Sequence, residues 1–184
     1  MIAIILFLIL FDTAFSTVDK NCKPAEGPKA LKCFQKLTDI TDSAGTLDLN
    51  QFANTDKLNK LCKDFKQPCA SSLKCGSGKE VVEAVDGVLD LCDAVHFLSV
   101  GFLDCDEKLN TKNSTCVQEW DPFPDEVEDP VKMAEIQKKA CENFFGKDNC
   151  LEKEVKELCD EDMWTQFKKH YLALNKIVEA CKFD

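Results

Sequence analysis

Cysteine is the residue type that gives this chain its most specific chemistry. The 184 residues include twelve cysteines, an even number that can pair completely in an oxidising compartment. They are Cys22, Cys33, Cys62, Cys69, Cys75, Cys92, Cys105, Cys116, Cys141, Cys150, Cys159 and Cys181. Structural zinc is the competing interpretation, but such sites need close ligand pairs, and the sequence contains no Cys-x-x-Cys. We therefore expect all twelve to form disulfides, with no metal site and no cofactor.

The sequence contains two histidines, His96 and His170, and neither belongs to a recognisable catalytic pattern. A phospholipase A2-like site would need a His-Asp pair beside adjacent cysteines, and the chain has no Cys-Cys pair. A Gly-x-Ser-x-Gly nucleophile elbow is also absent. We interpret both histidines as amphipathic or surface residues of helices, and we predict a protein that is not an enzyme.

One modification motif is present. Asn113-Ser114-Thr115 is the only Asn-x-Ser/Thr sequence in the chain, and it lies in a polar run over residues 110–115. Such motifs accept N-linked glycans where they lie at the surface of secreted proteins. The sequence therefore predicts glycosylation at Asn113.

The N-terminus resembles a secretory signal peptide. The apolar run Ile2–Phe11 is shorter than the roughly 20 residues that a membrane-spanning helix needs. Small residues at Ala14 and Ser16 suit cleavage between Ser16 and Thr17. We therefore expect residues 1–16 to be removed and residues 17–184 to form a single secreted, extracellular domain with no membrane span.

Charge excludes one class of partner. The formal net charge is −10, and all 23 basic residues are lysines. Nucleic-acid binding needs a basic surface that neutralises phosphates, and bidentate phosphate recognition needs arginine. An acidic surface is also repelled by anionic lipids. We expect no nucleic-acid partner and no binding to anionic membranes.

The cysteine spacings point to an internal duplication. Both halves of the cysteine series run short, long, short, short, long, and Cys62-Lys-Asp-Phe65 matches Cys141-Glu-Asn-Phe144. Repeats of this kind indicate two similar supersecondary units. We predict two six-cysteine units, at about residues 21–103 and 104–184. If each unit closes on itself, the same pairing should hold in both.

Helix geometry excludes one pairing. Leu151, Val155 and Leu158 predict a short helix between Cys150 and Cys159, whose ends would lie about 13.5 Å apart. A disulfide requires Cα atoms within about 7 Å. Cys150 and Cys159 should therefore bond to other cysteines, and by correspondence Cys69 and Cys75 should not pair with each other.

Apolar residues recur at helical spacing, and no useful length of alternating strand pattern occurs. Helix starts are predicted by a capping box at Ser77 and Glu80, by Asp129-Pro130 and by Asp160. One apolar helix face is formed by Val81, Val85, Val88, Cys92, Val95, Ser99 and Phe102. The predicted fold class is all-α: a disulfide-rich helical domain built from two similar six-cysteine units.

The segment from Trp120 to Pro130 breaks the helical pattern. It contains three prolines and five acidic residues. Its order of residues differs from the alternating Asp/Asn-and-Gly pattern of a calcium-binding EF-hand loop. We therefore predict a solvated loop.

The framework as a whole resembles one known family. Four features carry the resemblance: the signal peptide, the order of the cysteines, the Pro-Cys-x-x-Ser-Leu-x-Cys run at Pro68–Cys75 and the closing helix before Cys181. The chain resembles the nematode-expanded secreted family called domain of unknown function 19, and within it the short members called uncharacterised protein family 0376. This resemblance covers Asn21–Lys182. It implies secretion and disulfides, and it supplies no catalytic residues.

Two functions remain open. The first is a monomeric, non-catalytic extracellular interaction protein with an unknown protein partner, for example in host defence. The alternative is a carrier of a lipid or other apolar small molecule, in which Phe97, Phe102, Phe144 and Phe145 would line a cavity. Saposins and insect odorant carriers share the count of six cysteines but differ in spacing. Phenylalanine at helical spacing more often forms core.

Overall fold

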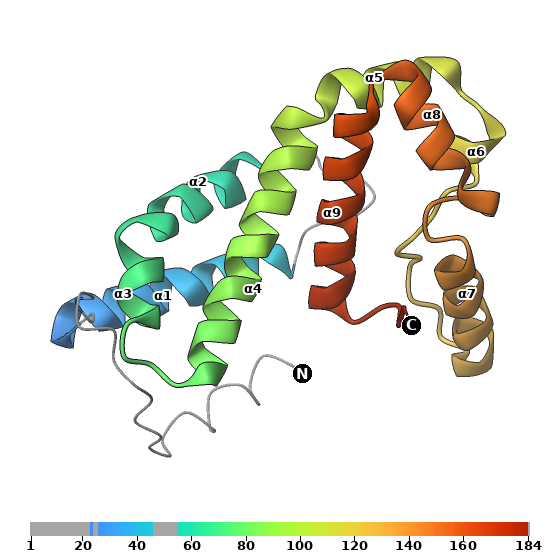
Figure 1. Cartoon of the computed structure of the whole chain (residues 1–184). Coiled ribbons are helices and arrows are strands. Elements are labelled where there is room, and N and C mark those ends of the chain that lie inside the picture. Colours follow the sequence, from blue (N-terminus) through green and yellow to red (C-terminus); the bar gives the residue numbers. More distant parts are fainter. Residues whose placement is uncertain (1–22, 24–25, 46–54, 184) are drawn as a thin grey trace. The chain divides into compact units, whose positions relative to one another are not determined.

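The computed structural model describes residue 23, residues 26–45 and residues 55–183. Over these residues it consists of helices, turns and loops without strands (Figure 1), which confirms the all-α fold class. The predicted signal peptide, its cleavage site between Ser16 and Thr17, and Cys22 lie outside the described residues.

Two compact parts can be distinguished. The N-terminal part contains the described residues of Met1–Asp42 and Lys60–Leu89, and the C-terminal part those of Ser43–Asn59 and Asp90–Asp184. The division passes through helices α2 (Asp56–Phe65) and α4 (Lys79–His96) and through the last turn of α1 (Gly27–Ala44). These two parts have different boundaries from the two predicted six-cysteine units. The internal duplication therefore stays a prediction.

Helix α1 (Gly27–Ala44) is fastened to the π-helical turn η2 (Lys66–Ala70) within the N-terminal part. The Cys33–Cys69 disulfide joins them, and the Lys36 ammonium donates a hydrogen bond to the Asp64 carbonyl at 2.8 Å. Gln67 in η2 has extended backbone angles, as expected for a residue that precedes proline. Helix α3 (Ser71–Lys74) follows directly.

The predicted capping box at Ser77 is wrong. Helix α4 begins at Lys79, and the amides of Val81 and Val82 bond to the Gly78 carbonyl. The Ser77 hydroxyl instead donates to the Leu73 carbonyl at the end of α3. A serine hydroxyl can donate to the carbonyl four residues earlier, as it does here. Because α4 begins at Lys79, Gly78 rather than Ser77 lies directly before the helix.

The C-terminal part is built around helix α9 (Glu161–Val178). The other elements that lie wholly within it are η3 (Phe97–Gly101), α5 (Leu103–Lys112), α6 (Thr115–Gln118), α7 (Pro130–Glu142), η4 (Lys147–Asn149) and α8 (Cys150–Leu158). Helices α5 and α6 both contact α8, which also packs on α9 (Figure 1).

Two predicted helix starts are confirmed. The Asp129 carboxylate accepts hydrogen bonds from the Val131 and Lys132 amides at 2.9 and 3.2 Å, with Pro130 in the first helical position of α7. The Asp160 carboxylate accepts from the Met163 amide at 2.6 Å at the start of α9. These caps satisfy amides that lack partners within the helix.

Aromatic rings form the core of the C-terminal part. Residues Trp164, Phe167, Tyr171 and Leu174 follow one face of α9 and are buried. The Phe167 and Tyr171 rings lie 4.4 Å apart, between centroids. Contacts of this kind add to the free energy gained by burial of large apolar surfaces.

The loop before α7 is anchored rather than fully solvated, which corrects the prediction for this segment. The Trp120 indole N–H donates to the Phe144 carbonyl at 3.0 Å, and the Trp120 ring packs on Tyr171. Pro122 is also buried. The prediction rested on the acidic composition of the whole segment. Composition does not show which individual side chains, such as Trp120 and Pro122, pack against the rest of the protein.

The chain end is held by a buried amide. The Asn175 side chain donates to the Cys181 carbonyl at 2.8 Å and accepts from the Cys181 amide at 2.7 Å. The Cys141–Cys181 disulfide fastens the same residue to α7. Together these contacts satisfy buried polar groups and fix the tail that follows α9.

Candidate functional site: a hollow beside the two histidines

Disulfides position the helices on which the candidate site depends. In the described part of the chain, disulfides join Cys33 to Cys69, Cys105 to Cys159, Cys116 to Cys150 and Cys141 to Cys181. Cys62, Cys75 and Cys92 are also disulfide-bonded. The prediction that Cys150 and Cys159 bond elsewhere is confirmed, and their partners come from α6 and α5. Cys69 likewise bonds to a residue other than Cys75.

Both histidines of the chain line one surface hollow of about 380 Å³. It lies in the C-terminal part, where the end of α4 and η3 face α9. Its lining residues are Asp93, His96, Phe97, Val100, Gly101, Gln166, Lys169 and His170. The hollow thus combines an aromatic ring and an exposed valine with acidic, basic and amide side chains, a mixture suited to a polar partner with an apolar contact.

His170 is buried, whereas His96 is exposed as predicted. The surface interpretation of His170 is therefore wrong. Its ring stacks on Phe97 with centroids 4.7 Å apart and planes inclined by 24°. The sequence alone does not predict this contact, because Phe97 in η3 and His170 in α9 are far apart along the chain.

Burial lowers the pKa of His170 below its ordinary value, because an imidazolium ion is poorly solvated there. The positive charge of Lys169 acts in the same direction, while Asp93 and Asp90 oppose it. The floor of the hollow is thus the His170 ring stacked on Phe97, both buried, and burial favours the neutral form of this imidazole. The charged residues Asp93 and Lys169 are exposed.

The π-helical turn η3 shapes this floor. Phe97 is buried, and a Cβ atom added at Gly101 would lie 3.2 Å from the Phe97 ring. The Ser99 hydroxyl donates to the Val95 carbonyl at 2.6 Å and accepts from the Asn59 amide at 2.9 Å. Such π-helical turns often occur at functional sites.

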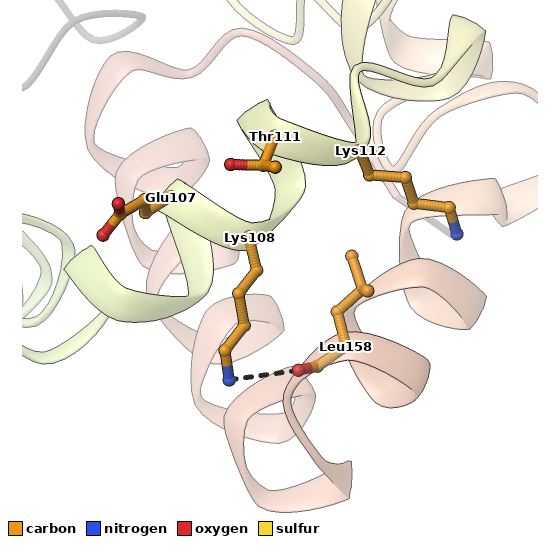
Figure 2. A pocket seen from close by; sticks show the side chains of 5 residues that line it. All are labelled: Glu107, Lys108, Thr111, Lys112 and Leu158. Atoms are coloured by element: carbon orange, nitrogen blue, oxygen red, sulfur yellow. Dashed lines mark hydrogen bonds between the residues drawn. The ribbon is translucent and has the colours of Figure 1, made fainter.

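A second hollow lies where α5 meets the end of α8 (Figure 2). Its volume is about 410 Å³, and it is lined by Glu107, Lys108, Thr111, Lys112 and Leu158. The Lys108 ammonium reaches across it to the Leu158 carbonyl at 3.2 Å. Since this bond helps to satisfy the end of α8, we interpret the hollow as a helix junction.

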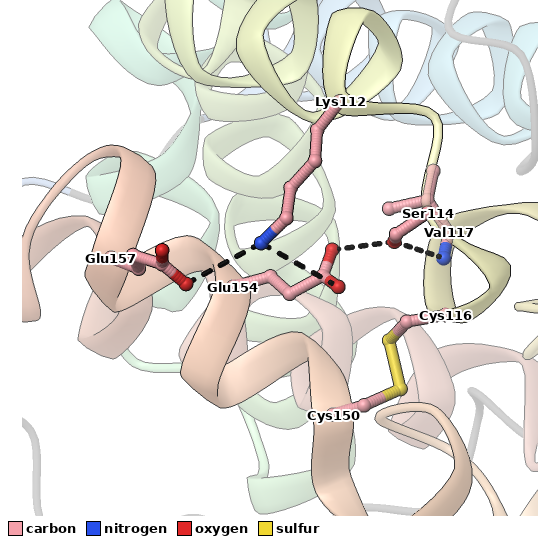
Figure 3. A network of polar contacts seen from close by, with 7 residues as sticks. All are labelled: Lys112, Ser114, Cys116, Val117, Cys150, Glu154 and Glu157. Atoms are coloured by element: carbon pink, nitrogen blue, oxygen red, sulfur yellow. Dashed lines mark hydrogen bonds and ion pairs between the residues drawn. A yellow bond between two sulfur atoms is a disulfide. The ribbon is translucent and has the colours of Figure 1, made fainter.

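The predicted glycosylation residue, Asn113, lies at the end of α5 and is exposed. It adjoins a polar network that includes Lys112, Ser114 and Glu154 (Figure 3). The other predicted site residues, Ser16 and Thr17, lie outside the described residues.

Across residues 26–45 and 55–183, no group of three or more His, Cys, Asp or Glu side chains is placed to hold a metal ion. None of the helices in the described part of the chain combines the length and apolar character required to cross a membrane.

Comparison with known proteins places the chain in a family. Residues 22–182 match the domain of unknown function DUF19. This chain belongs to that family. The UPF0376 protein F10G2.1 of Caenorhabditis elegans is 36% identical over 167 residues, which cover 89% of this chain and 83% of that protein. No solved structure matches the chain.

Two further relatives come from the same organism. Excretory canal abnormal exc-13 is 35% identical over 175 residues, covering 92% of this chain and 86% of that protein. The UPF0376 protein C36C5.12 is 30% identical over 169 residues, covering 89% of this chain and 77% of that protein. The DUF19 family has no assigned function. The comparisons therefore support the family membership of this chain and do not supply a molecular function.

Proposed function

We propose that this DUF19 protein is a secreted, monomeric, non-catalytic protein that binds an extracellular protein partner. The observation that carries the proposal is the packing of the phenylalanines that a carrier would use to line a cavity. Phe97 packs on Phe102 and Phe144 on Phe145, with centroids 5.7 and 5.0 Å apart. These contacts use the rings for packing within the protein. Phe97 also lines the hollow beside the two histidines, whereas Phe102, Phe144 and Phe145 line neither of the two hollows described above. This packing favours recognition by the surface over enclosure of an apolar ligand.

Secretion is supported by the disulfides, since such bonds persist in oxidising compartments. A cross-linked helical scaffold loses little conformational entropy when it binds, which favours recognition by a rigid surface. Host defence is one setting for such a protein. The name of the exc-13 relative offers another place to search for partners, the excretory canal.

Native mass spectrometry separates this proposal from the carrier alternative. The protein is secreted from an oxidising eukaryotic host and measured without extraction of small molecules. We expect the mass of the processed polypeptide with its covalent modifications. A co-purifying lipid or other apolar molecule would instead establish the carrier function.

Photo-crosslinking tests whether the hollow beside the histidines contacts the partner. Val100 in this hollow and Val131 on α7 are both exposed, at 54% and 69%, and so form a matched pair. A photoreactive phenylalanine analogue at position 100 should give a discrete adduct in extracellular fluid, while the same analogue at 131 should not. Equal adducts at both positions would exclude the hollow as the binding surface.

A further inference from the structure

The Asn113 motif follows directly on α5. Asn113 ends this helix in the left-handed conformation, with φ 48° and ψ 44°, and its amide donates to the Leu109 carbonyl at 3.1 Å. Asparagine adopts this conformation more readily than most residues. The motif is therefore held in a defined turn whose backbone orients the Asn113 side chain.

Residues on both sides of Asn113 are fastened to α8 (Figure 3). The Lys112 ammonium lies 3.4 Å from the Glu157 carboxylate and 3.8 Å from that of Glu154. The Ser114 hydroxyl donates to Glu154 at 2.7 Å, and the Cys116–Cys150 disulfide follows. Alternate residues of the segment thus face α8.

The residues between these contacts are exposed. Both Asn113 and Thr115, which supplies the hydroxyl group of the motif, lie at the surface. Asn113 Oδ1 accepts a hydrogen bond from Gln118 Nε2 at 2.9 Å. Among the described residues, Asn113 Nδ2 donates no hydrogen bond, and this is the atom that carries an N-linked glycan.

We propose that Asn113 carries one N-linked oligosaccharide and that it is attached before the Cys116–Cys150 disulfide closes. In the transfer, Nδ2 forms a bond to the anomeric carbon of a lipid-linked oligosaccharide pyrophosphate. The bond from that carbon to the pyrophosphate oxygen breaks, the amide nitrogen loses a proton, and the lipid pyrophosphate leaves.

The order of events follows from the contacts on α8. A transferase must draw the acceptor segment into its own cleft, and this requires backbone on both sides of Asn113. In the folded protein Ser114 bonds to Glu154, 40 residues later in the chain, and Cys116 is covalently tied to Cys150. The acceptor is therefore accessible before α8 docks, while the attached sugar remains in solvent afterwards.

Intact mass spectrometry tests the modification, which rests on the proposed secretion. Protein from the medium of a eukaryotic host is measured before and after peptide-N-glycosidase treatment. We expect the loss of one glycan, with conversion of Asn113 to aspartate. Secreted protein without a glycan would overturn this inference while leaving secretion intact. Protein retained in the cell with a glycan would overturn the proposed release, and retained protein without one would overturn both.

Variants test the motif and the timing. Asn113→Gln and Thr115→Ala should abolish the glycan, whereas Thr115→Ser and the neighbouring control Asn110→Gln should keep it. Replacement of both Cys116 and Cys150 by serine should leave occupancy at least as high as in the original protein. Lower glycan occupancy in that double variant would overturn the proposed order, because glycan transfer would then depend on the closed Cys116–Cys150 disulfide.

Discussion

At the scale of single residues, His170 makes the stability of the protein dependent on pH. Its folded-state pKa is lowered by burial and by Lys169, with Asp93 and Asp90 opposing the shift. The unfolded chain therefore binds a proton at a higher pH than the folded chain does. The His170 contribution to stability is complete above the unfolded pKa of about 6.5 and is lost as pH falls from there through the folded pKa.

Denaturant unfolding at a series of pH values checks this expectation. His170→Gln should reduce the loss of unfolding free energy over this acidic range, because it removes the titrating group. His96→Gln is the matched control, since it removes the exposed histidine of the same hollow. Identical pH profiles for His170→Gln and the original protein would contradict the assignment.

Gly146 is a second residue whose identity is dictated by its surroundings. Its backbone, at φ 80° and ψ 163°, lies in a region that is essentially restricted to glycine. A Cβ atom here would also lie 2.5 Å from Cys150 Sγ and 3.1 Å from Cys116 Sγ. We expect Gly146→Ala to lower the free energy of unfolding by at least about 1–3 kcal/mol.

Gly87 within α4 provides the contrasting substitution. A Cβ atom added there would meet no atom within 4 Å. Gly87→Ala should therefore raise the free energy of unfolding by about 0.5–1 kcal/mol, because alanine is the better residue for a helix interior. Both values come from guanidinium unfolding, and equal effects of the two substitutions would show that neither backbone angle nor contact at Gly146 matters.

At the scale of elements, the disulfides supply the order in which the first six cysteines should pair. In the second six, the first cysteine bonds to the fifth, the second to the fourth, and the third to the sixth. Cys33–Cys69 joins the second and fourth of the first six. If the duplication holds, the same order predicts Cys22–Cys75 and Cys62–Cys92.

Proteolysis under non-reducing conditions, followed by peptide mass mapping, checks this pairing. The prediction for Cys22 rests on sequence order, since that residue lies outside the described residues. Fragments that link Cys22 to Cys75 would support a common pairing in the two units. Any other partner for Cys22 would show that the shared spacing does not produce a shared connectivity.

At the scale of the whole molecule, the disulfides determine whether the fold survives. Each contributes on the order of 2–4 kcal/mol, whereas a domain is stable by only about 5–15 kcal/mol in total. We therefore expect reduction to unfold the protein at room temperature. Far-UV circular dichroism should show loss of helix in strong reductant, and an unchanged spectrum with an unchanged thermal transition would contradict this account.

The amino-acid sequence determined the features that depend on neighbouring residues. The all-helical class follows from apolar spacing, and Asp129 and Asp160 cap their helices because each carboxylate needs only an amide within the next turn. Helix geometry likewise separated Cys150 from Cys159. The capping box at Ser77 failed because α4 begins at Lys79, which places Gly78 rather than Ser77 directly before the helix.

Only the tertiary structure decided the features that depend on residues far apart in the chain. The burial of His170 against Phe97 needs α9 and η3 to meet, and the anchoring of Trp120 needs the Phe144 carbonyl. The two hydrogen bonds of the Asn175 side chain depend on the position of the Cys181 backbone, which the tertiary structure sets. Packing chooses one of many possible long-range contacts, and residue type and spacing alone do not specify which.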